Sequence, residues 1–251
     1  MKKRMFGWNN AILALLGVPL MLVSISTILY RDLLFRDYES FDLVDSDNSV
    51  SILFVGNSHI FWGKVPKQLH IISKEYGIKI AYKDISRNGA HLSRTKDEAI
   101  IELQSGKYDY VVFQENTRLL PDNIEDFLAI IRLLCDEARG NGTIPVLFNP
   151  AVADNSSQKV YSEAYLTASD ENDAILVNAG DAWIYAYQMI PGISLYAWDG
   201  MHANNAGAFY TACLFAAVLF ELHIVEIPNN NLYKGNDALS LAQAAREFAR
   251  S

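Results

Sequence analysis

Short apolar runs alternate with longer amphipathic segments from residue 51 onward. Five runs rich in β-branched and aromatic residues are continuously apolar, which is typical of strands covered on both faces. They span residues 51–55, 78–85, 109–113, 144–149 and 174–178. Helical spacing predicts helices over about 65–76, 95–105, 122–140, 158–170, 181–190, 205–222 and 237–250. This alternation of strand and helix predicts an α/β fold, a parallel sheet with helices on both sides.

An uncharged segment near the N-terminus has a different character. Residues 5–30 carry no charge, and residues 11–30 are mostly apolar, which is enough for a helix to cross the roughly 30 Å core of a bilayer. The preceding "KKR" predicts a signal anchor with a cytoplasmic N-terminus and an extracytoplasmic remainder. A cleaved signal peptide, which would leave the remainder secreted, is the alternative; the long apolar run favours the anchor. Residues 1–30 are thus predicted to form a cytoplasmic basic tip followed by the membrane anchor. Residues 31–48 are predicted to form a linker, and residues 49–251 a single domain.

Composition narrows the function classes. The chain is 51% hydrophobic and 12% aromatic, which is ample for a packed core. Its net charge of −8 and the lack of a basic stripe argue against a nucleic-acid partner. No metal-ligand spacing or phosphate-binding glycine loop is present, so no cofactor is predicted. Cys135 and Cys213 lie in apolar helical stretches and are predicted to be buried free thiols, with one disulfide as the open alternative.

Candidate chemistry lies after the predicted strands, because open parallel sheets bind ligands beyond the carboxyl ends of their strands. Ser58 follows the first strand and could be a nucleophile if a base took its proton. His202 is the best candidate base, and Asp199 could hold its imidazole and fix the tautomer. Gly200 would allow a tight turn between them. Taken alone, Ser58 would be interpreted as a helix cap.

Two further residues could stabilise an oxyanion. Gly89 follows the second strand and could offer a backbone N–H, while Asn116 follows the third and could offer a side-chain amide. Together with the Ser58 amide they make three donors for a tetrahedral intermediate. Taken singly, Gly89 indicates a turn and Asn116 a turn or cap. The Gly-x-Ser-x-Gly elbow of α/β-hydrolases is absent, because Ile60 occupies its last position.

These residues fall into an ordered set of blocks, Gly56-Asn57-Ser58, Gly89, Asn116 and Asp199-x-x-His202. The order resembles the SGNH/GDSL-type serine hydrolase superfamily. The stretches "LFVGNSHI", "DYVVFQENT" and "LYAWDGMHANNAGAFYTACLF" are similar to bacterial members with GNS in the first block and a Gln-Glu pair in the third. The resemblance spans roughly residues 51–222.

The resemblance implies a fold and a chemistry. The fold is a three-layer α/β/α sandwich with a five-stranded parallel sheet, related to flavodoxin-like folds. The chemistry is ester hydrolysis through an acyl-serine, with Ser58 as nucleophile, His202 as base and Asp199 as its partner. Gly89 and Asn116 would complete the oxyanion hole with the amide of Ser58.

Three positions depart from the common pattern of that superfamily. Asn57 replaces the aspartate beside the nucleophile, and Ala203 replaces a proline that often follows the histidine. Gln114 stands where glycine is usual, which affects the placement of Asn116. The neighbouring Glu115 is either an anchor for its loop or a solvated charge.

Four ring-bearing side chains are candidate substrate contacts. His59 adjoins the nucleophile, and His91 lies two residues past the oxyanion glycine. Trp62 and Trp198 flank the two catalytic blocks and could form an aromatic wall for a sugar or an acyl group. Plain packing is the favoured alternative for the two tryptophans.

The sequence as a whole predicts a membrane-anchored esterase acting on an O-acetyl or other short acyl group of an envelope or extracellular carbohydrate. The linker enters the domain at the start of the first strand, opposite the predicted site, so the site would face away from the bilayer. An acyltransferase remains an open alternative, because a sugar hydroxyl could replace water. A second alternative is a non-catalytic carbohydrate-binding or assembly module on the same fold. The departures at Asn57 and Gln114 are the features that leave this alternative open. No oligomeric state follows from the sequence.

Overall fold

The computed structural model describes residues 49–118, 123–152 and 155–251. The predicted anchor and linker, residues 1–48, lie outside the described residues. Within the described ranges, no helix is long and apolar enough to cross a membrane.

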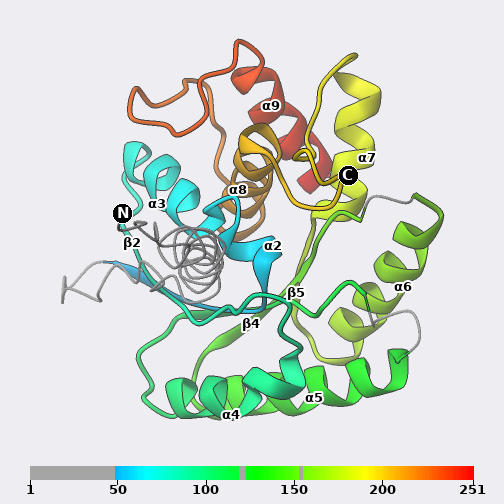
Figure 1. Cartoon of the computed structure of the whole chain (residues 1–251). Helices are drawn as coiled ribbons and strands as arrows, with labels where there is room; N and C mark the ends of the chain where they lie inside the picture. Colours follow the sequence, from blue (N-terminus) through cyan, green and yellow to red (C-terminus); the bar gives the residue numbers. More distant parts are fainter. Residues whose placement is uncertain (1–48, 119–122, 153–154) are drawn as a thin grey trace, which may run out of the picture. The chain divides into compact units, whose positions relative to one another are not determined.

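The core of the fold is a parallel five-stranded sheet with strand order β2-β1-β3-β4-β5 (Figure 1). The strands are β1 (Val50–Val55), β2 (Ile80–Asp84), β3 (Tyr110–Phe113), β4 (Ile144–Asn149) and β5 (Ile175–Asn178). The chain passes from β1 to β2 on one side and then returns to place β3 on the other side of β1. A ligand crevice is expected where the strand order reverses, at the carboxyl ends of β1 and β3.

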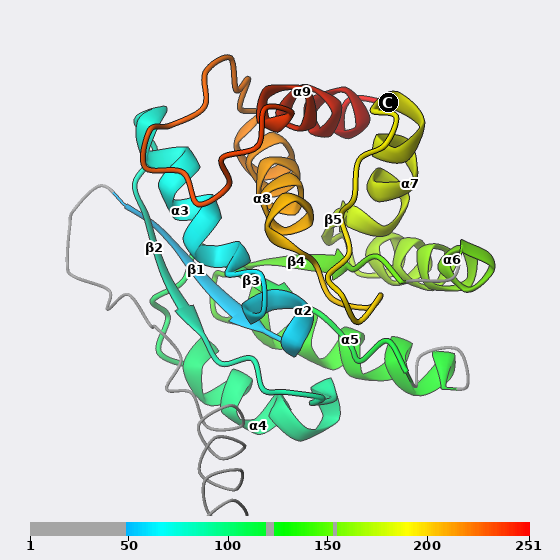
Figure 2. The same ribbon diagram turned by 45° about the horizontal axis from the view of Figure 1, so that its top comes forward.

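Helices cover both faces of this sheet, as Figures 1 and 2 show. In β1, Ile52 and Phe54 face one hydrophobic cluster, and Leu53 and Val55 face the other, because successive side chains of a strand alternate. The first cluster is closed by α3 (Val65–Glu75), α7 (Ala179–Met189), α8 (Asn205–Phe220) and α9 (Ala238–Ala249). The second is closed by α4 (Leu92–Leu103), α5 (Ile124–Gly140) and α6 (Asn155–Glu171). The predicted three-layer α/β/α architecture is therefore confirmed.

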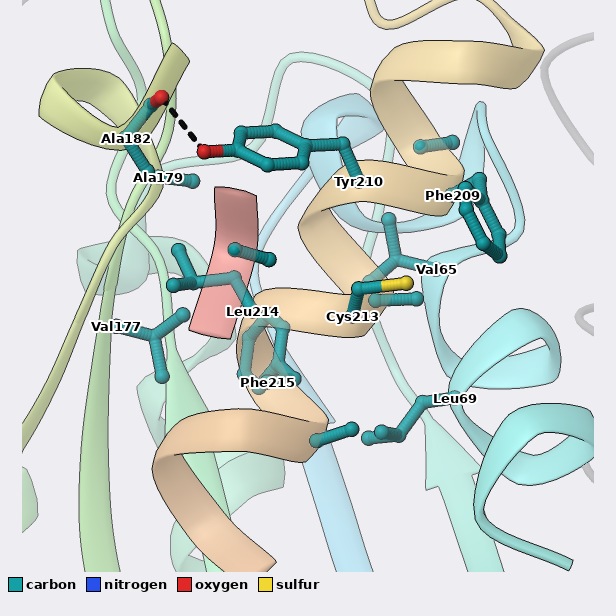
Figure 3. Close-up of a cluster of buried hydrophobic side chains, with 14 of the residues drawn as sticks. Val65, Leu69, Val177, Ala179, Ala182, Phe209, Tyr210, Cys213, Leu214 and Phe215 are labelled. Atoms are coloured by element: carbon teal, nitrogen blue, oxygen red, sulfur yellow. Dashed lines mark hydrogen bonds between the residues drawn. The ribbon is translucent and has the colours of Figure 1, made fainter. Parts of the chain in front are cut away.

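Helix α8 is enclosed on nearly every side, so its sequence has no polar face. All residues over 206–217 are buried. On the side of the sheet, the Phe215 ring packs edge-on against Phe54 and Phe148. Figure 3 shows the Tyr210 hydroxyl, which donates to the Ala182 carbonyl at 2.8 Å. Because α8 begins three residues after His202, its packing anchors the loop that carries this imidazole.

The two cysteines lie on opposite faces of the sheet. Cys135 belongs to the cluster beneath α5, whereas Cys213 belongs to the cluster around α8. Both are free thiols, so the prediction of buried thiols is confirmed and the disulfide alternative is wrong. Burial raises the pKa of Cys135 to about 12 and also raises the pKa of Cys213.

Candidate active site

Ser58 is the first residue of α2 (Ser58–Phe61), a one-turn helix directly after β1. The cap of this helix is Asn57, whose Oδ1 accepts a hydrogen bond from the His59 N–H at 3.2 Å. Interpreting Ser58 as the helix cap is therefore wrong, and its hydroxyl bonds elsewhere. The turn places Ser58 at the carboxyl end of β1, beside the reversal of strand order.

A tight loop before α8 carries Asp199 and His202. Gly200 adopts φ of +65° within it, a left-handed conformation that favours glycine. The Ala197 N–H donates to the His202 carbonyl at 2.7 Å. One oxygen of Asp199, Oδ1, accepts from the backbone N–H groups of Met201 and His202, both at 3.0 Å. This leaves the second carboxylate oxygen available to the imidazole.

Ser58, His202 and Asp199 form a continuous hydrogen-bonded chain. His202 Nε2 lies 2.8 Å from Ser58 Oγ, and its Nδ1 lies 2.5 Å from Asp199 Oδ2. Burial acts to raise the pKa of Asp199, but hydrogen bonds from the His202 ring and from the amides of Met201 and His202 outweigh it and lower this pKa to about 2. An ionised carboxylate accepts from Nδ1–H, so Nε2 is left to accept the proton of Ser58.

Two rings lie next to His202. Trp62 stacks on its imidazole, with centroids 4.4 Å apart and planes 9° from parallel. The ring of His59 lies 5.4 Å away, and its Nε2 is 3.2 Å from Thr117 Oγ1. Burial first, and the nearby His202 second, lower the pKa of His59 to about 3, against an opposing effect of Asp199. His59 is therefore neutral near pH 7 and adds no charge beside His202.

The two candidate oxyanion residues lie in contact with each other. Asn116 Nδ2 donates to the Gly89 carbonyl at 2.9 Å, and an amide nitrogen carries a second hydrogen that can serve a ligand. Asn116 Oδ1 accepts from the Arg118 N–H at 2.9 Å, so Asn116 also makes the turn that its residue type predicts. The loop after β1, which carries Ser58, is linked to the Gly89 loop through Asn57, whose Nδ2 donates to the Ala90 carbonyl at 3.2 Å.

The other two candidate contacts differ in setting. His91 lies with Nδ1 3.5 Å from Glu115 Oε1. Glu115 is buried, so its interpretation as a solvated charge is wrong and its role as a loop anchor is retained. Trp198 is 91% exposed beside Asp199. The packing interpretation of Trp198 is therefore wrong, whereas Trp62 packs on the imidazole itself.

Three contacts at this site were not predicted from the sequence: the stacking of Trp62 on His202, the bond from His59 to Thr117, and the bond from Asn57 to Gln114. The first had a signal, because residues four apart share one face of a helical turn. No local pattern indicated the other two, which join loops that are distant in the sequence.

No family model and no curated protein matches the chain. Solved structures do match. A DUF4886 family protein from Bacteroides uniformis is similar at a TM-score of 0.68, with 18% identity over 80% of this chain and 94% of that one. A putative SGNH hydrolase from Slackia heliotrinireducens is similar at 0.57, with 21% identity over 68% and 100% of the two chains.

An acetylxylan esterase from Geobacillus stearothermophilus is similar at a TM-score of 0.56, with 16% identity over 70% of this chain and 97% of that one. At sequence identities this low, similarity to a solved structure establishes the fold alone. The chain therefore has the fold of SGNH hydrolases, and the resemblance noted in its sequence blocks is confirmed at that level.

Proposed function

We propose that this protein is a serine hydrolase that cleaves carboxylic esters through an acyl-Ser58 intermediate. The observation that carries the proposal is the hydrogen-bonded chain Ser58–His202–Asp199 at the carboxyl edge of the sheet. Serine is a weak nucleophile without a neighbouring base, and this arrangement supplies one.

In the acylation step, Ser58 Oγ attacks the ester carbonyl while His202 Nε2 takes the hydroxyl proton. The carbonyl oxygen becomes an oxyanion, which the amides of Ser58 and Gly89 and the second N–H of Asn116 would stabilise. The ester C–O bond then breaks, and the imidazolium returns its proton to the departing alcohol. Asp199 stabilises the imidazolium throughout, since it remains ionised.

Deacylation repeats these steps with water. His202 Nε2 takes a proton from the water as its oxygen attacks the acyl carbon, and then returns the proton to Ser58 Oγ as the acid departs. A sugar hydroxyl in place of water would give acyl transfer instead, which stays the first alternative. A non-catalytic binding module on this fold is the second.

For the substrate we propose an O-acetyl or other short acyl group on a carbohydrate. Trp198 supports this choice, because an exposed indole beside Asp199 can stack on a sugar ring. An acetylxylan esterase is among the proteins of similar fold. Release of acetate from soluble acetylated oligosaccharides by the full chain tests the choice. Turnover of bilayer lipid without turnover of soluble sugar esters would contradict it.

The proposal includes attachment to a membrane through residues 11–30, with the domain over 49–251 outside the cytoplasm. The support is the uncharged apolar run behind "KKR". Fractionation of cells expressing the full chain should leave the protein in the membrane after a high-pH carbonate wash, and protease added outside the membrane should remove the domain. Recovery of a shortened, freely secreted chain would instead show cleavage of the N-terminal segment.

The hydrolase proposal is tested with a fluorophosphonate probe on the full chain in detergent. Wild type should be labelled, Ser58→Ala should not, and His202→Ala should be labelled much more slowly. Ser93→Ala, on the exposed surface of α4, is the matched serine control and should be labelled like wild type. No labelling of folded wild type would favour the binding module, and labelling of Ser58→Ala would exclude Ser58 as the nucleophile.

A further inference from the structure

Two consecutive residues after β3 are buried although both are polar. Gln114 is 0% exposed and Glu115 8% exposed. A carboxylate or amide is costly to bury unless hydrogen bonds replace its contacts with water. Both side chains make such bonds, and each bonds to the loop after a different strand.

Gln114 holds the loop after β1. Its Oε1 accepts from the Asn57 N–H at 3.0 Å, and its Nε2 donates to the Glu115 carbonyl. The fit is tight, because a Cβ at Gly56 would lie 2.8 Å from Gln114 Oε1. Gln114 thus fixes the backbone one residue before Ser58.

Glu115 holds the loop after β2. Both of its carboxylate oxygens lie 3.3 Å from the Leu92 N–H group, and Oε1 also accepts from the Asn116 N–H at 2.5 Å. Helix α4 has no side-chain cap of its own at His91, so Glu115 caps it from the loop after β3. Burial raises the pKa of Glu115, and the hydrogen bonds from these amides and from His91 oppose the rise.

The same loops are cross-linked by the two asparagines already described. Asn57 bonds to Ala90, and Asn116 bonds to Gly89. Side chains at four positions therefore tie together the ends of β1, β2 and β3, each of which supplies one candidate oxyanion donor. All four are buried.

We propose that Gln114 and Glu115 are positioning residues that set the relative placement of the three oxyanion donors, Gln114 through Asn57 and Glu115 through the loop that contains Gly89. The inference rests on the proposed hydrolase function. An oxyanion hole requires its donors within about 2.7–3.1 Å of one point. Donors on three separate loops meet this requirement only if the loops are held to one another, since a displacement of about 1 Å can cost roughly 100-fold in rate.

The test uses Gln114→Ala, Glu115→Ala and Glu115→Gln in the full chain, with turnover of a short-chain aryl ester. The expected result is a fall in kcat of roughly 10- to 100-fold for the alanine variants, with KM within about twofold. Fluorophosphonate labelling should slow in parallel, because the phosphoryl oxygen uses the same donors. Glu115→Gln should recover part of kcat, since its amide oxygen can still accept from Leu92 or Asn116.

The matched controls are Glu98→Gln and Gln104→Ala. Glu98 is an exposed residue of α4 that pairs with Arg87 of the same β2 loop, and Gln104 is an exposed residue that bonds to Glu137. Both controls should keep wild-type kcat. Thermal unfolding of each variant gives the folded fraction at the assay temperature.

Three outcomes overturn the inference. Folded alanine variants with wild-type kcat would mean that the two side chains only stabilise the fold. A loss of activity that merely follows the folded fraction, and disappears on cooling, would mean the same. Wild type without turnover or labelling would overturn the proposed function, and this inference with it, whereas an active wild type beside unchanged variants overturns the inference alone.

Discussion

Ser58 and Trp62 are four residues apart, so one helical turn presents both on the same face. His202 contacts both: its Nε2 bonds to Ser58 Oγ, and the Trp62 indole stacks on its ring. A ring face stabilises an adjacent cation through its quadrupole. Trp62 is therefore placed to favour the imidazolium that the proposed mechanism forms at His202 when it takes the proton of Ser58.

Replacing Trp62 with leucine should lower kcat by roughly fivefold, because the lost cation–π contact is worth about 1 kcal/mol. Trp62→Phe should keep part of this contact, so its kcat should lie between those of wild type and Trp62→Leu. Steady-state kinetics with a short-chain aryl ester would measure both. Trp198→Leu is the control, since Trp198 is exposed and should leave kcat for so small a substrate unchanged. An unchanged kcat in Trp62→Leu would show that the stack does not assist proton transfer.

Asp199→Asn should lower kcat by roughly 10³- to 10⁴-fold with KM little changed, because a neutral amide neither fixes the tautomer of His202 nor stabilises its imidazolium. The pKa of Asp199 is about 2 in the folded protein, against about 3.8 in the unfolded chain. The stabilisation of the fold by its ionised carboxylate is therefore complete above about pH 3.8 and is lost only as the pH falls through about 2. Titration of Asp199 should therefore leave no limb in a pH–activity profile above pH 5.

The control for this variant is Asp136→Asn, an exposed carboxylate of α5. It makes the same chemical change far from the candidate site and should keep wild-type rates. Activity of Asp199→Asn within tenfold of wild type would contradict the assigned role of the carboxylate.

At the scale of elements, the strands were predictable because burial on both faces requires continuous apolar runs such as that of β1. The ends of the helices were less predictable, since the cap of α4 is Glu115, a residue of the distant loop after β3. Helix α2 was missed, because a single turn is too short to show a helical period. Ser58, Gly89 and Asn116 were predictable as neighbours since parallel strands end at one edge. Asp199 and His202 follow α7 rather than a strand and were predicted from their place in the ordered blocks, whereas Gln114 acts through a contact that no spacing encodes.

Strand β2 ends in a buried carboxylate that should make stability depend on pH. Burial raises the pKa of Asp84 from 3.8 to about 6, while a hydrogen bond from the Ser86 N–H at 2.9 Å partly offsets this rise. Between these two pKa values the folded state holds a proton that the unfolded state has released. The free energy of unfolding therefore falls as the pH rises from about 3.8 to about 6 and levels off above that.

Asp84→Asn should raise the free energy of unfolding by roughly 3 kcal/mol at pH 8, where wild type buries a charge, and by only about 1 kcal/mol at pH 4.5. An asparagine oxygen can still accept from Ser86. Urea unfolding at the two pH values would measure the difference. Asp97→Asn, an exposed site on α4, is the control and should show no such dependence. An equal effect of Asp84→Asn at both pH values would contradict an ionised Asp84 in the fold.

At the scale of the whole described unit, one sheet separates two hydrophobic clusters and is shared by both. Neither cluster can open fully without exposing a face of the same strands, so the two layers should unfold together. The two cysteines report on this directly, because each lies in one cluster.

In variants that keep a single cysteine, Cys135→Ala and Cys213→Ala, a thiol reagent should react very slowly with the native protein. Both remaining thiols are buried and have raised pKa values, so reaction requires opening of the fold. If opening is global, both labelling rates should rise with urea along the same slope and report the same free energy, within about 1 kcal/mol once each variant's own stability is taken into account. A rate at either cysteine that is insensitive to urea would show local opening of that layer. The candidate base His202 is anchored by α8 in one layer, and the Gly89 loop leads into α4 in the other. Local opening of one layer would therefore also show that the candidate site rests on two layers of unequal stability.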